Sequence, residues 1–284
     1  SVYAYYGARI VVPLIVPYLI LRTKLYRNTV LCLRSLLIII IVLLPLVLGF
    51  GKNPDVLFGR AKTVSVFYDQ GTKLRLWELI SQDGISAKPI ITRFFHNRLY
   101  LYLQKIFRNY LVHFDGSYLL LKGDNSQPFQ IPGMGILYII DGIFLISGLV
   151  ILFKNNNPGR SFFILFLLIS IIPASLTFMV PSSNRTFNAV FPFAFFIALG
   201  IYWFNNLKKP LFMLAFLIAI SYVLNFSFFL GKYFVDLPLN FSQNWNYGWR
   251  EAALYSKKIE RDYDNIIVSG KNGMPYIYFL FYNR

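Results

Sequence analysis

The sequence predicts a mainly α-helical protein that crosses a membrane several times. Apolar residues make up 56% of the 284 residues and charged residues only 14%, which is more apolar surface than one water-soluble core can bury. The chain has six apolar runs that approach, with their flanks, the roughly 20 residues that a transmembrane helix needs. We therefore expect a polytopic bundle of about six helices, with a long extracytoplasmic loop containing amphipathic helices and a truncated extracytoplasmic α/β tail.

The apolar runs fall into two groups separated by a polar stretch. Residues 1–50 hold two of them, Tyr5–Leu21 and Leu33–Phe50, and Pro13 and Pro17 are expected to kink the first. Residues 131–230 hold the other four: Ile131–Phe153, Ser161–Val180, Thr186–Phe204 and Pro210–Leu230. The polar stretch, residues 51–130, is predicted to be a loop, and residues 231–284 a tail.

The short connections between the runs predict the orientation. Those on one side carry eight basic residues and no acidic one: Arg22, Lys24, Arg27, Arg34, Lys154, Arg160, Lys208 and Lys209. The short connection on the opposite side carries only Arg185. Because short cytoplasmic connections are enriched in Lys and Arg, this pattern places the long loop and the tail outside the cell membrane.

The long loop has helical patterning. Leu99, Leu103, Ile106, Phe107 and Tyr110 recur on one face of a helix predicted within Pro89–Tyr110, and its basic residues fall largely off that face. A second helical segment is predicted at Thr72–Ile80. Such an amphipathic helix either lies along the outer headgroups or packs on the membrane domain, and the pattern favours neither alternative.

In the tail, Tyr247–Asp262 is predicted to be a helix and Asn265–Ser269 a short buried strand, followed by a Gly-Lys-Asn-Gly turn. These elements would begin a small α/β domain cut off at Arg284. Neither a start methionine nor a signal peptide is recognisable, so the chain is expected to be an internal fragment.

Several function classes are excluded by composition. The net charge of +16 is spread beside apolar runs instead of forming a basic stripe, which argues against nucleic acid as a partner. The single cysteine, Cys32, permits neither an intrachain disulfide nor a CxxC metal site. Motifs such as GxGxxG, HExxH and GxSxG are missing, and two histidines are too few for a multi-histidine metal centre.

The remaining candidates are polar residues near the predicted outer surface. Arg9 and Asp141 lie at similar predicted depth, where they either line a cavity for an anionic lipid head or form an ion pair that fixes helix packing. Arg185 either clamps a phosphate or snorkels at the interface.

Other candidates lie in the long loop. The cations of Arg93, His96 and Arg98, with Arg60 and Lys62 nearby, suit a phosphate group or a solvated helix face. Asp115 and Asp124 are a base, a metal ligand or simple turn residues.

The order of several motifs resembles the C-terminal half of bacterial GT-C membrane glycosyltransferases, the protein mannosyltransferase and aminoarabinose-transferase-like group. The motifs are Tyr5-Tyr6-Gly-Ala-Arg9, Asn109-Tyr-Leu-Val-His113-Phe, Lys122-Gly-Asp124, Ile131-Pro-Gly-Met-Gly-Ile-Leu-Tyr138, Ile172-Pro-Ala-Ser-Leu-Thr177, the loop with Arg185, the Pro192 helix ending at Gly200, and Trp245-Asn-Tyr-Gly-Trp-Arg-Glu251. The chain departs from that group at Gln127-Pro-Phe129, where relatives carry a basic or histidine-containing pair. It departs again at Ser182-Ser183-Asn184, because in that group a histidine precedes the arginine of the short loop.

The resemblance implies inverting transfer of a sugar from a polyprenyl-phosphate carrier to a glycan, lipid or protein acceptor at the outer face. The family's catalytic carboxylate lies in the first outer loop, which would precede Ser1. This chain would then supply the side of the site that binds the lipid phosphate, through Arg9, Arg93, His96, Arg98, His113 and Arg185, supported by Arg60, Asp124 and Asp141. The resemblance leaves open whether a divalent metal ion takes part, and nothing in this half forms a carboxylate cage for one.

The main rivals are a transporter of lipid-linked glycans, a polymerase or ligase-like membrane protein, and a non-catalytic scaffold. A transporter would more readily show inverted repeats, and no repeat is recognisable in the sequence. The long outer loop and the outer tail favour an enzyme.

Overall fold

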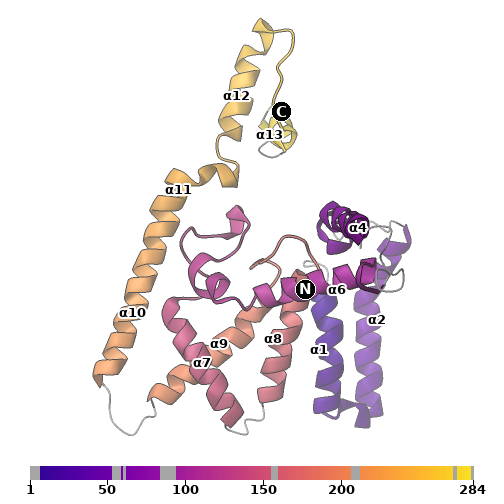
Figure 1. The fold of residues 1–284 in the computed structure, drawn as a ribbon, viewed down its shortest axis with the longest axis vertical. Helices are drawn as coiled ribbons and strands as arrows, with labels where there is room; N and C mark the ends of the chain where they lie inside the picture. The colour runs from indigo at the N-terminus through magenta and orange to yellow at the C-terminus, as the bar shows by residue number, and fades with distance from the viewer. Residues whose placement is uncertain are drawn as a thin grey trace.

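A computed structural model describes residues 7–52, 59, 62–83, 94–154, 159–205, 212–270 and 274–282 (Figure 1). These residues are mainly helical and contain no β-strand, apart from an isolated antiparallel bridge between Ser65 and Thr177. The prediction of a mainly α-helical chain is confirmed.

Six apolar helices form the body. They are α1 (Ala8–Arg22), α2 (Thr29–Lys52), α7 (Ile139–Lys154), α8 (Arg160–Ser175), α9 (Val190–Asn205) and α10 (Phe212–Gly231). Figure 1 shows α1, α2 and α8 upright, α7 and α9 crossing, and α10 slanted at the edge. Helix α1 packs along α8 through Val11, Ile15 and Ile169.

The expectation of six spans is not met by helix length. Among the described residues, three helical segments are long and apolar enough to cross a membrane: Thr29–Gly49, Phe187–Phe204 and Met213–Asn240. Helices α1, α7 and α8 have 15, 16 and 16 residues. At 1.5 Å per residue they measure about 22 to 24 Å, short of a hydrocarbon core about 30 Å thick. Three long apolar helices still indicate a membrane protein.

Two of the helices are shorter than the predicted apolar runs for identifiable reasons: α7 begins later and α8 ends earlier. Residues 131–138 stay outside α7, since Gly133 adopts φ +79° and Gly135 lies too close to the backbone of Leu119 and Leu120 for any side chain. Helix α8 stops at Ser175 because the following residues pair with residues 64–66: the Val66 amide donates to the Leu176 carbonyl. Hydropathy alone does not report either tertiary contact.

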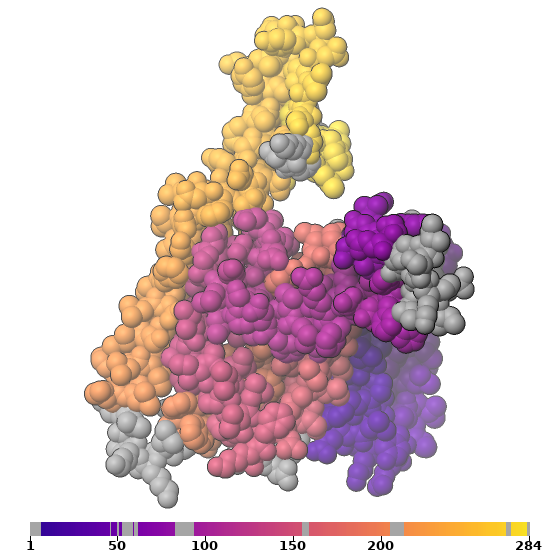
Figure 2. All heavy atoms as spheres, viewed as in Figure 1, coloured from indigo at the N-terminus to yellow at the C-terminus, as the bar shows by residue number. Residues whose placement is uncertain are grey.

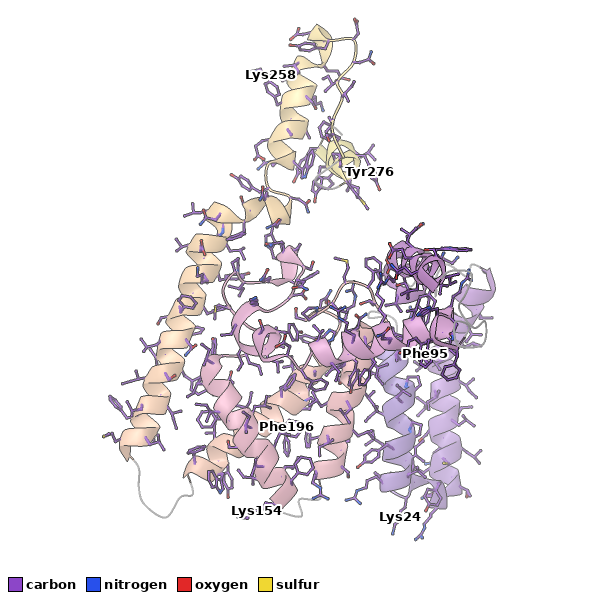
Figure 3. All side chains as sticks on the ribbon, viewed as in Figure 1. Lys24, Phe95, Lys154, Phe196, Lys258 and Tyr276 are labelled. Atoms are coloured by element: carbon purple, nitrogen blue, oxygen red, sulfur yellow. The ribbon has the colours of Figure 1, made fainter. Side chains whose placement is uncertain are left out.

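The crossing of α7 and α9 depends on two glycines. A Cβ atom on Gly148 would overlap the carbonyl of Phe196, and one on Gly200 would overlap the carbonyl of Phe144. Small residues let apolar helices approach this closely. Phe196 is fully buried at the crossing (Figure 3).

Two polar helices lie over the upper ends of α1, α2 and α8: α4 (Gln70–Asp83) and α6 (Arg98–Val112) (Figure 1). Asp69 caps the start of α4 by accepting from the amides of Gly71 and Thr72, each at 3.2 Å. The same carboxylate forms an ion pair with Lys105 of α6. The hydrogen bond from Lys105 lowers the pKa of Asp69, so the contact between α4 and α6 is present at neutral pH.

The tail follows α10 through a short π-helical turn and contains α11 (Leu237–Asn240), α12 (Trp249–Ile259) and α13 (Pro275–Tyr282). It rises above the body in Figure 2. The helix predicted at Tyr247–Asp262 is confirmed as α12, but the strand at Asn265–Ser269 is wrong. These five residues form no regular element, because no partner strand lies beside them in the described chain to pair their backbone groups. The α/β character predicted for the tail is therefore wrong in the described residues.

Basic residues from two of the short connections lie at the same end of the body. Lys24 and Lys154 lie at the lower end in Figure 3, whereas α4, α6 and the tail lie at the upper end. The helix ends thus agree with the alternation predicted from charge.

We predict that Gly200→Ala destabilises the fold, because the added methyl group overlaps the Phe144 carbonyl and separates α7 from α9. Overpacking of this kind costs about 1 to 3 kcal/mol. Gly231→Ala is the matched control: it makes the same change where the added atom meets nothing within 4 Å. Thermal unfolding in lipid nanodiscs should show a lower midpoint for Gly200→Ala alone. Equal midpoints for the two variants would contradict the close crossing.

Candidate functional site

A short loop between α8 and α9, Val180 to Thr186, forms the centre of the candidate site. Ser182 and Thr186 are buried, although they lie outside any long helix. Buried backbone amides need hydrogen-bond partners, and side chains far away in the sequence supply them. We call this segment the outer loop.

His113 holds the first part of the outer loop. It lies at the C-terminal end of α6 and is 1% exposed. The Ser182 amide donates to its Nε2 at 3.1 Å, and its Nδ1 donates to the Asn109 carbonyl at 2.7 Å. This pattern assigns the neutral tautomer with the proton on Nδ1. Burial lowers the pKa of His113, with Arg185 acting in the same direction.

Asp124 holds the middle of the outer loop. Its carboxylate accepts from the Ser183 amide at 2.6 Å, the Ser183 hydroxyl at 2.9 Å and the Ser126 amide at 2.7 Å. Like His113, it is 1% exposed. A carboxylate with three donors and almost no contact with solvent serves as an anchor, so the interpretation of Asp124 as a turn residue is favoured over a catalytic base.

Asparagine and tyrosine side chains complete the anchoring. Asn125 donates to the Val180 carbonyl at 2.8 Å, and Asn109 donates to the Thr177 carbonyl at 2.8 Å. The hydroxyls of Tyr118 and Thr186 lie 3.2 Å apart, and burial raises the pKa of Tyr118 to about 12. Sequence reasoning did not select Asn125 or Tyr118, and it named Asn109 only as the first residue of a motif without giving it a role. The four-residue spacing of Asn109 and His113 places both on one helix face and was the available signal.

A cavity of about 380 Å³ lies against the outer loop. One part of its wall is polar and comes from His113, Tyr118, Ser183, Asn184 and Thr186. The other part is apolar and includes Phe187, just before α9, and Val190, Phe193, Ala194 and Ile197 along α9. The lining is thus divided into a polar and an apolar part. We call this the carrier cavity, after the lipid carrier that the motif resemblance implies.

A second cavity of about 370 Å³ is adjacent to the first and shares three lining residues with it: Phe129, Ile136 and Leu137. Its polar lining comes from Asp124, Gln130, Tyr138 and Asp141. We call it the acidic cavity, because its lining contains two aspartates and neither lysine nor arginine.

Asp141 stabilises the start of α7. Its Oδ2 accepts from the Tyr138 amide at 2.9 Å, and its Oδ1 accepts from the Tyr222 hydroxyl of α10 at 2.5 Å. These bonds, and not the expected ion pair with Arg9, hold the carboxylate. Arg9 lies in the first turn of α1, which packs on α8, whereas Asp141 links α7 to α10.

The structure brings together only part of the predicted phosphate site. His113, Asp124 and Arg185 gather at the outer loop, where the Nη1 of Arg185 donates to the Met179 carbonyl at 3.0 Å. His96 and Arg98 lie at the opposite end of α6, whose 15 residues measure about 22 Å. Arg60 and Arg93 fall outside the described residues. His113 cannot act as a cation here, because it is neutral with both ring nitrogens bonded.

Comparison with family models, with curated proteins and with solved structures gave no match. The likeness to GT-C glycosyltransferases therefore stays an expectation from the motifs. Among the described side chains, no three histidine, cysteine, aspartate or glutamate residues gather where they could hold a metal ion.

We predict that Asp124→Asn destabilises the protein by about 1 to 3 kcal/mol, because an amide presents only one acceptor oxygen and buried donors of the outer loop lose their partner. Asp115→Asn is the control, since Asp115 also caps a turn by accepting from the Ser117 amide but is exposed. Denaturant unfolding in mild detergent measures both. The anchoring role fails if the two variants lose the same stability.

The lowered pKa of His113 predicts a pH dependence. A histidine with a depressed folded pKa contributes stability above its ordinary value of 6.5 and loses it as pH falls through the folded value. Protonation also breaks the bond from the Ser182 amide. The temperature midpoint of unfolding should therefore decrease as the pH is lowered from neutral to mildly acidic. His113→Gln, which keeps an acceptor without titrating, should flatten this slope. An unchanged slope in the variant would assign the pH dependence to other groups.

Proposed function

We propose that this chain is part of a membrane glycosyltransferase that transfers a sugar from a polyprenyl-phosphate carrier to an acceptor at the extracytoplasmic face. The observation that carries this proposal is the carrier cavity, whose polar wall belongs to the anchored outer loop and whose apolar wall runs along α9. A polyprenyl phosphate has the same division between a charged head and an apolar chain. A membrane helix as the apolar wall lets the chain enter from the lipid.

Arg185 is the cation that we assign to the carrier phosphate. It follows Asn184, which lines the carrier cavity, and its position is fixed by the anchors on both sides. In the reaction, the acceptor hydroxyl oxygen forms a bond to the anomeric carbon while the bond from that carbon to the phosphate oxygen breaks. The acceptor proton passes to a carboxylate base, which the resemblance implies in the first outer loop of the family. Arg185 stabilises the negative charge that develops on the leaving phosphate.

The two cavities differ in charge in a way that supports this assignment. The acidic cavity repels a phosphate, so the carrier head is favoured in the cavity lined by Ser183 and Asn184, which precede Arg185 in the chain. Hydroxyl groups of a sugar or an acceptor are compatible with Asp141 and Gln130 across the shared wall. In this proposal the three shorter apolar helices also cross the bilayer, and the end with the basic connections faces the cytoplasm.

The test uses the full-length gene product in lipid nanodiscs with polyprenyl phosphates that carry a panel of labelled sugars. Arg185→Ala should weaken carrier binding and transfer by roughly tenfold to hundredfold, the effect of losing a charge-assisted hydrogen bond, and Arg185→Lys should restore part of it. Arg108→Ala, an exposed arginine on α6, is the control. If the wild type binds no carrier and transfers no sugar across the panel, the proposal is wrong and a transporter or scaffold takes its place.

A further inference from the structure

Helix α6 carries an apolar face that nothing in the described chain covers. Leu99, Leu103 and Phe107 follow each other at four-residue spacing, so they lie on one side of the helix. Their exposed fractions are 69%, 57% and 63%. Three large apolar side chains exposed in a row mark a contact surface.

The direction of this face follows from two contacts of α6. The hydroxyl of Tyr110, which lies on the same side as Leu103 and Phe107, donates to the Leu168 carbonyl of α8 at 3.0 Å. Leu168 precedes the end of α8 by seven residues, or about 10 Å along the helix. The face therefore points down beside the apolar helices. On the opposite side of α6, Lys105 bonds upward to Asp69 before α4.

The apolar face continues a surface that is itself lipid-like. Helix α2 lies beneath the far end of α6 (Figure 1), and the part of α2 long enough to span a membrane is entirely unburied within the described chain. The exposed side chain of Phe95 lies near the start of α6, beside the upper ends of the apolar helices (Figure 3). A protein partner would have to contact α2 and α6 at once, whereas a bilayer covers both.

We propose that α6 lies in the plane of the membrane, with Leu99, Leu103 and Phe107 inserted among the acyl chains of the outer leaflet. The basic residues support this placement: Arg98 and Arg108 are exposed on the remaining faces, where they reach lipid phosphates. This inference is independent of the proposed transfer reaction.

The placement also links the bilayer to the candidate site. His113 lies directly after α6 and holds the Ser182 amide. A helix fixed at the depth of the headgroups therefore fixes the height of the outer loop and of the carrier cavity.

The experiment measures depth with spin labels on the full-length protein in phosphatidylcholine and phosphatidylglycerol nanodiscs. Cys32, the single cysteine of this chain, and any cysteine elsewhere in the full-length protein are first replaced by serine. Labels are then attached at Leu103→Cys and Phe107→Cys, with Arg108→Cys as the matched control on a polar face of the same helix. Each of these three side chains is exposed, so the substitutions leave the core intact. Thermal unfolding of each labelled variant without any carrier lipid, compared with the wild type, checks that the fold is kept.

Labels at 103 and 107 should collide several-fold more often with oxygen, which concentrates in acyl chains, than with a water-soluble nickel chelate, and the label at 108 should show the reverse. Equal access of the chelate to all three labels would overturn the proposal. Immobilised labels at 103 and 107 that neither reagent reaches would overturn it as well, because they would mean that protein covers the face.

Discussion

The need to satisfy buried backbone amides in the outer loop governs the upper half of this protein. The loop enters the interior between α8 and α9, where the amides of Ser182 and Ser183 have no helical partner. His113 and Asp124 accept from them, and each comes from a different part of the long loop. Leaving one such donor unpaired costs more than the bond itself contributes. The long loop is thus held in place by hydrogen bonds from the backbone amides of the outer loop.

This requirement changes the chemical role of two candidate residues. The imidazole of His113 has both ring nitrogens bonded, and the carboxylate of Asp124 has three donors and almost no contact with solvent. Their function is to position other groups, above all Arg185 and the polar wall of the carrier cavity. Ser183, in the middle of the outer loop, is held by the bond from its hydroxyl to Asp124.

The lower half follows another constraint, the close approach of α7 and α9 at Gly148 and Gly200. The crossing sets the spacing of the helices whose upper ends hold the cavities. Helix α6 connects the outer loop to the apolar helices. One of its sides bonds to Asp69 before α4, another bonds to α8, and His113 follows its last residue. A change in the depth of α6 would be transmitted directly to the outer loop.

The sequence by itself determined the helical class, the six apolar helices and the amphipathic α6, because each is a local pattern of apolar and charged residues. It did not determine where α7 begins or α8 ends, since those limits depend on Gly135 against Leu119 and on residues 64–66 pairing with residues 176–178. The partners of His113, Asp124 and Asp141 were likewise decided only by the tertiary structure. Hydrogen bonds between residues some 60 to 80 positions apart leave no local pattern in a single sequence, so burial and folding alone select them.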